Sequence, residues 1–217
     1  MRSLDVVVIG AGGHSKIVID LLLEDPEVNI AGLLDDSPAS RNSKVMGFSV
    51  LGTVGEIQQL FPTTTKFIIS IGNNKTRCTI AKKLKELGYE PTNAISKNAI
   101  ISRHAFLGKG LIINPGVVIH PEATIEDHVV IGMNATISHD SVVKAGAHLS
   151  PGVHITGNVT VGERADLGAG VAVIPQRTIG RDTIVGAGAV VTKDLPEGIV
   201  AVGAPAREIK RIKETHS

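Results

Sequence analysis

The sequence predicts a chain in two parts, a small α/β half with a parallel sheet followed by a parallel β-helix. Strand-like and helix-like apolar patterns alternate through the first ninety or so residues, and an aliphatic residue then recurs at every sixth position from Ala99 to Asp194. Only 2% of the 217 residues are aromatic, so short aliphatic side chains have to fill the core, as in a narrow solenoid. We expect one domain over residues 1–92 and a second, with a C-terminal tail, over 93–217.

Composition excludes several classes of function. A formal net charge of +1 provides no electrostatic footprint for nucleic acid or for an anionic membrane. No stretch approaches the roughly 18 apolar residues of a membrane span. The single cysteine, Cys78, excludes an intramolecular disulfide and suits a reducing compartment. We therefore expect a cytoplasmic protein.

The first half alternates predicted strands and helices. Three apolar runs have the pattern of buried parallel strands: residues 4–10, 28–36 and 66–72. Three segments are predicted helices: residues 14–25, 55–60 and 73–88, the last closed by Gly88. Strand–helix–strand order implies a parallel sheet with right-handed crossovers. About ninety residues are too few for a complete dinucleotide fold, so we expect a half-Rossmann domain.

The second half consists of sixteen hexads without an insertion. The third position of every hexad is Ile, Leu or Val, and the first is mostly Ala or Val. Each hexad is expected to form a short strand and a turn, and three hexads to close one triangular coil of eighteen residues with the third positions stacked inside. The coils would extend for roughly 25 Å at a strand spacing of about 4.8 Å. The period leaves the handedness of the coil open.

A glycine-rich loop, residues 9–16, follows the first predicted strand and precedes a helix. Gly10, Gly12 and Gly13 allow backbone N–H groups to approach a phosphate there. Ser15 stands where the dinucleotide pattern has its third glycine. A tight turn without a ligand is the alternative interpretation of this loop.

Polar and small residues end the other two predicted strands of this half. Asp35 and Asp36 end the second strand, where an acidic group can bind a ribose or a base edge, and Gly72 ends the third. Because the carboxyl ends of parallel strands lie at one edge of a sheet, we expect these residues to border one ligand crevice.

Most histidines of the chain lie in the hexads: His104, His120, His128, His139, His148 and His154. A zinc site needs three converging imidazoles. Zinc-dependent carbonic anhydrases with the same coils carry two histidines five residues apart, and no such pair occurs here. We therefore expect no metal and consider most of these histidines to be solvated turn or face residues.

His139 differs because Asp140 follows it directly at a hexad corner. A neighbouring carboxylate fixes the tautomer of an imidazole and raises its basicity. Such a histidine suits removal of a proton from an amine or hydroxyl that attacks a thioester. A surface His–Asp pair without a function is the alternative.

Five motifs in order, GAGGHSK, LLDD, SIGNN, ATISHDS and GAHLSPG, resemble the NeuD/PglD family of sugar acyltransferases over almost the whole chain. The hexads and the ending GAGAVVTKDLPEGIVAVGAPAREIK are similar to the left-handed β-helix of hexapeptide acyltransferases. The resemblance implies a left-handed coil, and homotrimers with acetyl-CoA in the groove between subunits.

The resemblance also implies a role for each matching residue. His139 is the expected general base, and Asp140 the carboxylate that raises its basicity. The expected substrate contacts are Gly12, Gly13 and His14 at the phosphates, Asp35 and Asp36 on the uracil side, and Gly72. The expected acetyl-CoA contacts are His148 near the thioester, and Ala169 and Ala187 along the pantetheine and adenine. Many relatives carry an asparagine seven residues before the base, where this chain has Gly132, with Asn134 two residues on.

We therefore expect transfer of an acetyl group from acetyl-CoA to the amino group of a UDP-linked amino sugar. O-acetylation of sialic acid or of another sugar hydroxyl by the same histidine is the nearest alternative. A non-enzymatic trimeric scaffold would predict no binding of acetyl-CoA. A nicotinamide oxidoreductase is disfavoured, because the first half is short and the third glycine is missing.

Overall fold

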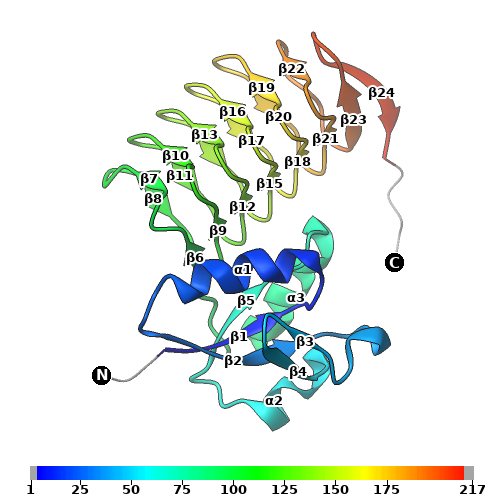
Figure 1. Cartoon of the computed structure of the whole chain (residues 1–217). Coiled ribbons are helices and arrows are strands. Elements are labelled where there is room, and N and C mark those ends of the chain that lie inside the picture. Colours follow the sequence, from blue (N-terminus) through cyan, green and yellow to red (C-terminus); the bar gives the residue numbers. More distant parts are fainter. Residues whose placement is uncertain (1–3, 213–217) are drawn as a thin grey trace. The chain divides into compact units, whose positions relative to one another are not determined.

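The computed structural model describes residues 4–212 and divides into two compact units (Figure 1). The first, called the α/β unit here, comprises Met1–Ser96 and Lys109–Ile112, and the second, the solenoid unit, comprises Lys97–Gly108 and Ile113–Ser217. No helix within residues 4–212 is long and apolar enough to cross a membrane.

The α/β unit contains a five-stranded sheet in the order β3-β4-β2-β1-β5. Its elements are β1 (Leu4–Ile9), α1 (Gly13–Leu23), β2 (Val28–Leu34), η1 (Pro38–Ser40), β3 (Lys44–Val45), β4 (Phe48–Gly52), η2 (Val54–Glu56), α2 (Ile57–Leu60), β5 (Lys66–Ile69) and α3 (Asn74–Glu86). The central strands are parallel, as predicted. Two strands were not predicted, β3 and β4, which form an antiparallel hairpin at the sheet edge. Their short, mixed pattern carries no clear alternation.

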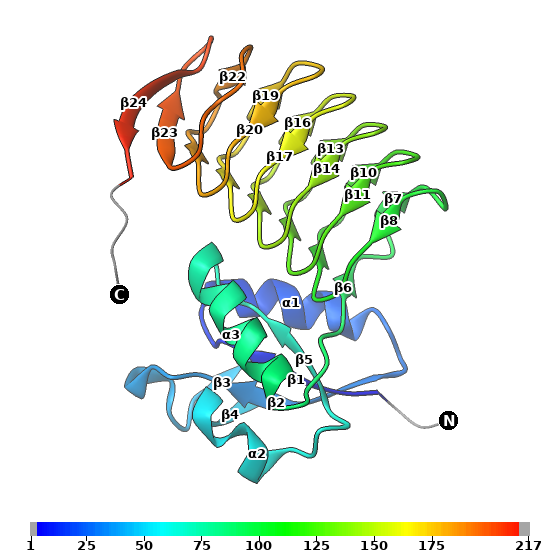
Figure 2. The same ribbon diagram turned by 180° about the vertical axis from the view of Figure 1, so that it is seen from behind.

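Helices cover both faces of this sheet because its central strands are apolar on both sides. Val7 and Ile9 of β1 belong to a buried cluster with side chains from α2 and α3. Val6 and Val8 are equally buried and alternate with them, so they face the opposite side, which α1 covers (Figures 1 and 2). Continuous apolar runs are expected for strands that are buried on both faces.

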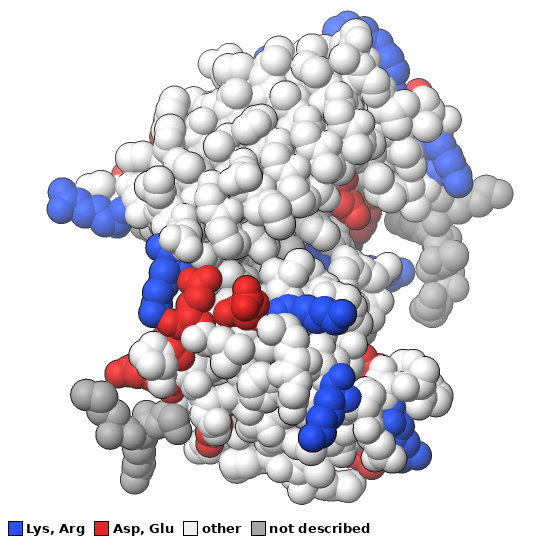
Figure 3. Space-filling view, in the orientation of Figure 1, with Lys and Arg blue, Asp and Glu red and all other residues white. Residues whose placement is uncertain are grey.

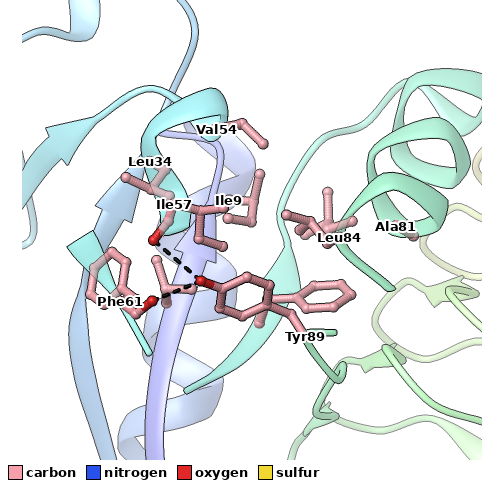
Figure 4. Close-up of a cluster of buried hydrophobic side chains, with 11 residues drawn as sticks. Ile9, Leu34, Val54, Ile57, Phe61, Ala81, Leu84 and Tyr89 are labelled. Carbon is pink, nitrogen blue, oxygen red and sulfur yellow. Dashed lines mark hydrogen bonds between the residues drawn. The ribbon is translucent and has the colours of Figure 1, made fainter. Parts of the chain in front are cut away.

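Tyr89 lies inside that cluster, and its hydroxyl donates hydrogen bonds to the backbone carbonyls of Phe61 at 2.7 Å and Ile57 at 3.3 Å (Figure 4). Tyr89→Phe should lower the free energy of unfolding by about 1–2 kcal/mol, because the buried Phe61 carbonyl loses this partner. The midpoint of urea denaturation at neutral pH measures the loss. A midpoint equal to that of the wild type would contradict it.

The same variant should change the response to alkali. Burial raises the pKa of the Tyr89 phenol. The folded protein therefore keeps this proton to a higher pH than the unfolded chain, in which tyrosine titrates near pH 10. The contribution is complete below about pH 10 and is lost as the pH rises further. Above about pH 10 the free energy of unfolding should therefore fall less steeply with pH in Tyr89→Phe than in the wild type.

The solenoid is a left-handed β-helix of two-residue strands with two longer strands at its C-terminal end, which confirms the predicted fold class. The strands are β6 (Ala94–Ile95), β7 (Ile100–Ile101), β8 (Phe106–Leu107), β9 (Ile112–Ile113), β10 (Val118–Ile119), β11 (Thr124–Ile125), β12 (Val130–Ile131), β13 (Thr136–Ile137), β14 (Val142–Val143), β15 (His148–Leu149), β16 (His154–Ile155), β17 (Thr160–Val161), β18 (Asp166–Leu167), β19 (Ala172–Val173), β20 (Thr178–Ile179), β21 (Ile184–Val185), β22 (Val190–Val191), β23 (Ile199–Val202) and β24 (Arg207–Arg211). Strands eighteen residues apart pair in parallel, as Thr136 does with His154. The strand β6 shows that the repeat begins one hexad earlier than Ala99.

The strands form three sheets, whose orders are β22-β19-β16-β13-β10-β7, β20-β17-β14-β11-β8 and β24-β23-β21-β18-β15-β12-β9-β6. The third-position aliphatics are buried from Ile113 onward, whereas Ile101 and Leu107 of the first hexads are not. Their strands β7 and β8 are the end strands of their sheets, so among residues 4–212 no further coil of the solenoid stacks on them from that side. At the other end β24 pairs antiparallel with β23.

From Gly110 to Gly188 each hexad ends in a corner whose last residue has a positive φ, for example +58° at Asp140 and +70° at Gly170. Corners eighteen residues apart stack in three rows along the solenoid. The His139 row, between the six- and five-stranded sheets, contains Pro121, His139, Gly157 and Pro175. The Ala169 row, between the eight- and six-stranded sheets, contains Met133, Pro151, Ala169 and Ala187.

Candidate active site

His139 and Asp140 form a hydrogen-bonded pair on an exposed corner. The Nδ1 atom of His139 lies 2.6 Å from Oδ2 of Asp140. An ionised carboxylate only accepts hydrogen bonds, so Nδ1 carries the proton and Nε2 is left with its lone pair as an acceptor. The left-handed backbone of Asp140, with φ +58°, is a conformation that aspartate tolerates better than most residues.

Exposure argues against a structural role for this pair. The side chains of His139 and Asp140 are 59% and 52% exposed. Ion pairs that are open to solvent contribute little to stability. A pair held this closely with so little structural benefit therefore fits a chemical role.

The next coil supports the imidazole. A Cβ placed on Gly157 would lie 2.8 Å from Cε1 and Nε2 of His139, closer than real contacts allow. The N–H of Asn158 donates to the His139 carbonyl at 3.1 Å. The buried hydroxyl of Ser141 donates to the Thr156 carbonyl at 2.8 Å and accepts from the Val159 N–H at 3.1 Å, which ties the corner to that coil.

Gly157 and Ser141 were not predicted as parts of this site. A signal was present for both. Gly157 follows His139 by eighteen residues, one predicted coil, and Ser141 occupies a first hexad position that is otherwise mostly aliphatic. Neither signal shows that the His139 imidazole packs directly over the Cα of Gly157.

The expected acetyl-CoA residues lie elsewhere on the solenoid unit. His148 belongs to β15 in the eight-stranded sheet, and Ala169 and Ala187 are exposed in the Ala169 row at one margin of that sheet. The His139 corner joins the other two sheets and therefore lies opposite the eight-stranded one. A single chain does not bring His139 together with His148, Ala169 or Ala187.

Gly132 is where many relatives carry an asparagine, and its surroundings exclude a side chain. A Cβ there would lie 2.5 Å from the Pro151 nitrogen. Asn134 has a φ of +57° at a corner of the Ala169 row rather than the His139 row. Gly132 belongs to that same corner, so within one chain neither position lies beside His139.

In the α/β unit the glycine loop has two kinds of glycine. Gly10 has a φ of +104°, and a Cβ there would lie 2.9 Å from the Ser70 hydroxyl, so the fold itself requires this glycine. At Gly12 and Gly13 a Cβ would meet nothing within 4 Å. These two, followed by His14, begin α1, and no side-chain hydrogen bond caps the helix. An uncapped helix N-terminus beside an open glycine pair is suited to binding a phosphate.

Asp35 and Asp36 have separate environments. Both carboxylate oxygens of Asp35 accept backbone N–H groups, from Ala11 at 2.6 Å and Ser37 at 2.7 Å. Asp35 therefore fixes the glycine loop against the end of β2. Asp36 is exposed and accepts the Val54 N–H through Oδ1 at 2.8 Å.

A pocket of about 230 Å³ lies beside these aspartates, and Arg41 and Glu56 also line it. Hydrogen bonds from the backbone and the hydroxyl of Thr53 lower the pKa of Glu56, so this carboxylate is ionised at neutral pH. The pocket thus combines negative carboxylates with one guanidinium, groups that can bind the hydrogen-bonding edge of a nucleotide.

The third predicted contact, Gly72, lies beyond β5 beside the glycine loop. The Ser70 hydroxyl contacts the carbonyls of Ile9 at 3.0 Å and Gly10 at 2.9 Å, which holds the two loops together. The structure therefore brings together the six predicted substrate residues of the α/β unit at one sheet edge. Within residues 4–212 no group of three or more His, Cys, Asp or Glu residues is placed to hold a metal ion.

Comparison with known proteins finds relatives of both parts of the chain. The PglD N-terminal domain matches residues 5–84, and the bacterial transferase hexapeptide (six repeats) matches residues 95–139. The structure of PerB from Caulobacter crescentus in complex with CoA and GDP-perosamine is similar at 38% identity, over 94% of this chain and 97% of that chain, with a TM-score of 0.86. The acetyltransferase domain of PglB from Neisseria gonorrhoeae in complex with acetyl coenzyme A is 32% identical, over 95% and 100%, with a TM-score of 0.87.

Curated relatives match only a segment. A putative acetyltransferase of Saccharomyces cerevisiae is 42% identical over 59 residues, 27% of this chain and 30% of the yeast protein. Galactoside O-acetyltransferase of Escherichia coli is 41% identical over 56 residues, 26% of this chain and 28% of that enzyme. The chain therefore spans less than a third of the length of these relatives.

The β-helix of six-residue repeats defines a hexapeptide-repeat acyltransferase. With its PglD-type N-terminal domain, the chain belongs to the NeuD/PglD type of sugar acetyltransferases, a family of acetyl-CoA-dependent enzymes.

Proposed function

We propose that this protein transfers the acetyl group of acetyl-CoA to the amino group of a nucleotide-linked amino sugar, with His139 as the general base. The observation that carries the proposal is the 2.6 Å contact between Nδ1 of His139 and Asp140 on an exposed corner. In this reaction the sugar nitrogen attacks the thioester carbonyl, and His139 Nε2 takes the proton that the nitrogen loses. The C–S bond then breaks, and the imidazolium returns the proton to the departing CoA sulfur.

The two parts of the chain have different tasks in this proposal. Residues 1–92 bind the nucleotide: the phosphates at Gly12, Gly13 and His14, and the base and ribose at the pocket beside Asp36. Residues 93–217 carry the base and the acetyl-CoA surface, where the short side chains of Ala169 and Ala187 leave room for an extended pantetheine. Binding both substrates in one orientation supplies up to about 7–11 kcal/mol in favourable cases.

The site also calls for a second copy of the chain. Because His139 lies opposite the sheet that carries His148, acetyl-CoA bound along Ala169 and Ala187 of one copy can reach only the His139 of another copy. We propose a homotrimer with sites between subunits.

The surface of the solenoid unit is consistent with such an assembly. In the six- and five-stranded sheets, no outward residue of strands β7–β22 is Lys, Arg, Asp or Glu. Figure 3 shows one face of the solenoid unit, and few charged side chains appear on it. Ile100 and Phe106 on these sheets are 68% and 60% exposed. Interface cores are depleted of charge in this way.

Two specific observations favour second candidates. The five motifs resemble enzymes that use UDP-linked sugars, so a UDP-linked sugar is our first choice. The similar PerB structure is a complex with GDP-perosamine, which favours a GDP-linked sugar as the second candidate. The segment shared with galactoside O-acetyltransferase favours a hydroxyl acceptor. An alcohol is a weaker nucleophile than a free amine and depends more strongly on the base. We place the reaction in the cytoplasm.

A panel assay tests the proposal. Release of free CoA thiol is followed with acetyl-CoA and, in turn, a UDP-4-amino sugar, GDP-perosamine, free sialic acid and a galactoside. We expect turnover only with the nucleotide-linked amino sugars, and highest with UDP, giving a product that resists hydroxylamine as amides do. Thiol release only with hydroxyl acceptors, or with none while acetyl-CoA binds, would contradict N-acetylation. Absence of any thermal shift with acetyl-CoA would favour a scaffold.

A further inference from the structure

Arg77 of α3 is a charged side chain that the proposed chemistry has not used, and it is only 1% exposed. Arginine is almost never fully buried unless specific partners hold it. Its Nη1 donates to the carbonyls of Ile71 at 3.0 Å and Gly72 at 3.2 Å, and its Nη2 donates to Oδ1 of Asn74 at 2.8 Å. One guanidinium thus holds the segment that connects β5 to α3.

These contacts set the direction of two backbone N–H groups. In a trans peptide the carbonyl and the N–H point in opposite directions. Since the carbonyls of Ile71 and Gly72 point at the guanidinium, the N–H groups of Gly72 and Asn73 point away from it. Neither N–H donates to another residue among 4–212, and Gly72 and Asn73 are exposed.

The segment lies beside the glycine loop. A Cβ on Gly10 would lie 3.1 Å from Cγ1 of Ile71, and the Ser70 hydroxyl bridges the two loops. At Gly72 a Cβ would meet nothing within 4 Å, so a ligand can approach its backbone.

We infer that Arg77 is a positioning residue for the nucleotide sugar: its buried guanidinium orients the Gly72 and Asn73 peptides so that their N–H groups face the ligand. The inference rests on the proposed function, because it takes the nucleotide sugar as the ligand of this sheet edge. Arg77 acts through the backbone and does not touch substrate. The planar fork matters as well as the charge, because a lysine ammonium cannot reproduce contacts to two carbonyls and an amide.

Arg77→Lys tests this, because it keeps the charge and removes the fork. We expect the KM for the nucleotide sugar to rise about tenfold, the size of losing one good hydrogen bond to a charged group, with kcat and the KM for acetyl-CoA within about twofold. The matched control is Ala81→Gly, which weakens the same helix from the apolar core and should leave both KM values unchanged.

The outcomes separate the inference from the function on which it rests. If the wild type neither binds nor acetylates any nucleotide sugar, the proposed function is wrong. If the wild type is active and Arg77→Lys has wild-type KM values, or if Ala81→Gly raises the nucleotide-sugar KM equally, the positioning role is wrong. Should Arg77→Lys not fold, Asn74→Ala removes one partner of the guanidinium and is expected to raise the same KM, and an unchanged value there would overturn the inference.

Discussion

His139→Ala should lower kcat by about 10²–10⁴-fold, the usual contribution of a positioned general base. The reason is the geometry of the corner, where Asp140 holds the proton on Nδ1 and leaves Nε2 to accept one from the attacking nitrogen. The KM for acetyl-CoA should change little, because the proton transfer to His139 occurs only in the transition state and not on binding of the cofactor. Steady-state kinetics with the best substrate of the panel measures both quantities.

His104→Ala is the matched control, since His104 is also an exposed histidine of the hexads and lies two coils away from the His139 corner. Its kcat should stay within about twofold of the wild type, as for surface changes away from a site. The general-base assignment is wrong if His139→Ala turns over normally at neutral pH, or if both variants lose activity equally.

Gly157→Ala should lower kcat by about 10–100-fold while the protein stays folded. The new Cβ would lie 2.8 Å from Cε1 and Nε2 of His139, so the exposed imidazole has to swing away from its support. Misplacing a reacting group by about 1 Å can cost 10²-fold in rate. Gly157 is not among the glycines with a positive φ, so alanine adds no backbone strain there.

A double-mutant cycle distinguishes this steric effect from a general loss of structure. If Gly157→Ala acts by moving the imidazole, it should have little further effect in a protein that already carries His139→Ala. Gly55→Ala is the control for glycine replacement, because the nearest side-chain atom, the Thr53 hydroxyl oxygen, would be 3.8 Å from the new Cβ. An additive loss in the double variant would contradict the proposed mechanism of the effect.

Much of the fold could be predicted because its signals are local. The hexads place an aliphatic residue inside every strand from Ile113 to Val191, and the structure has a two-residue strand in each of the sixteen hexads. In the first half, apolar runs located β1, β2 and β5, and helical spacing located α1 and α3 within a few residues. The hairpin of β3 and β4 was missed, since it depends on pairing with β2 at the sheet edge.

The candidate site was predicted less completely. The adjacency of His139 and Asp140 is visible in the sequence, but their 2.6 Å contact depends on a corner with positive φ at Asp140. Asp35 was expected to contact substrate, and the structure shows that both its oxygens accept backbone N–H groups. These contacts depend on the local backbone conformation and, for Ala11 and Asp35, join residues far apart along the chain, and periodicity records neither.

The sequence by itself determined the architecture of this protein, because a six-residue aliphatic period permits only a coil that buries its third positions against its neighbours. The tertiary structure alone decided which groups meet. It placed the His139 imidazole over Gly157, buried Arg77 behind Gly72, and put His148 on the sheet opposite His139. The physical reason is that side-chain direction and peptide orientation follow from packing between coils and loops, whereas the repeat specifies only which positions face inward.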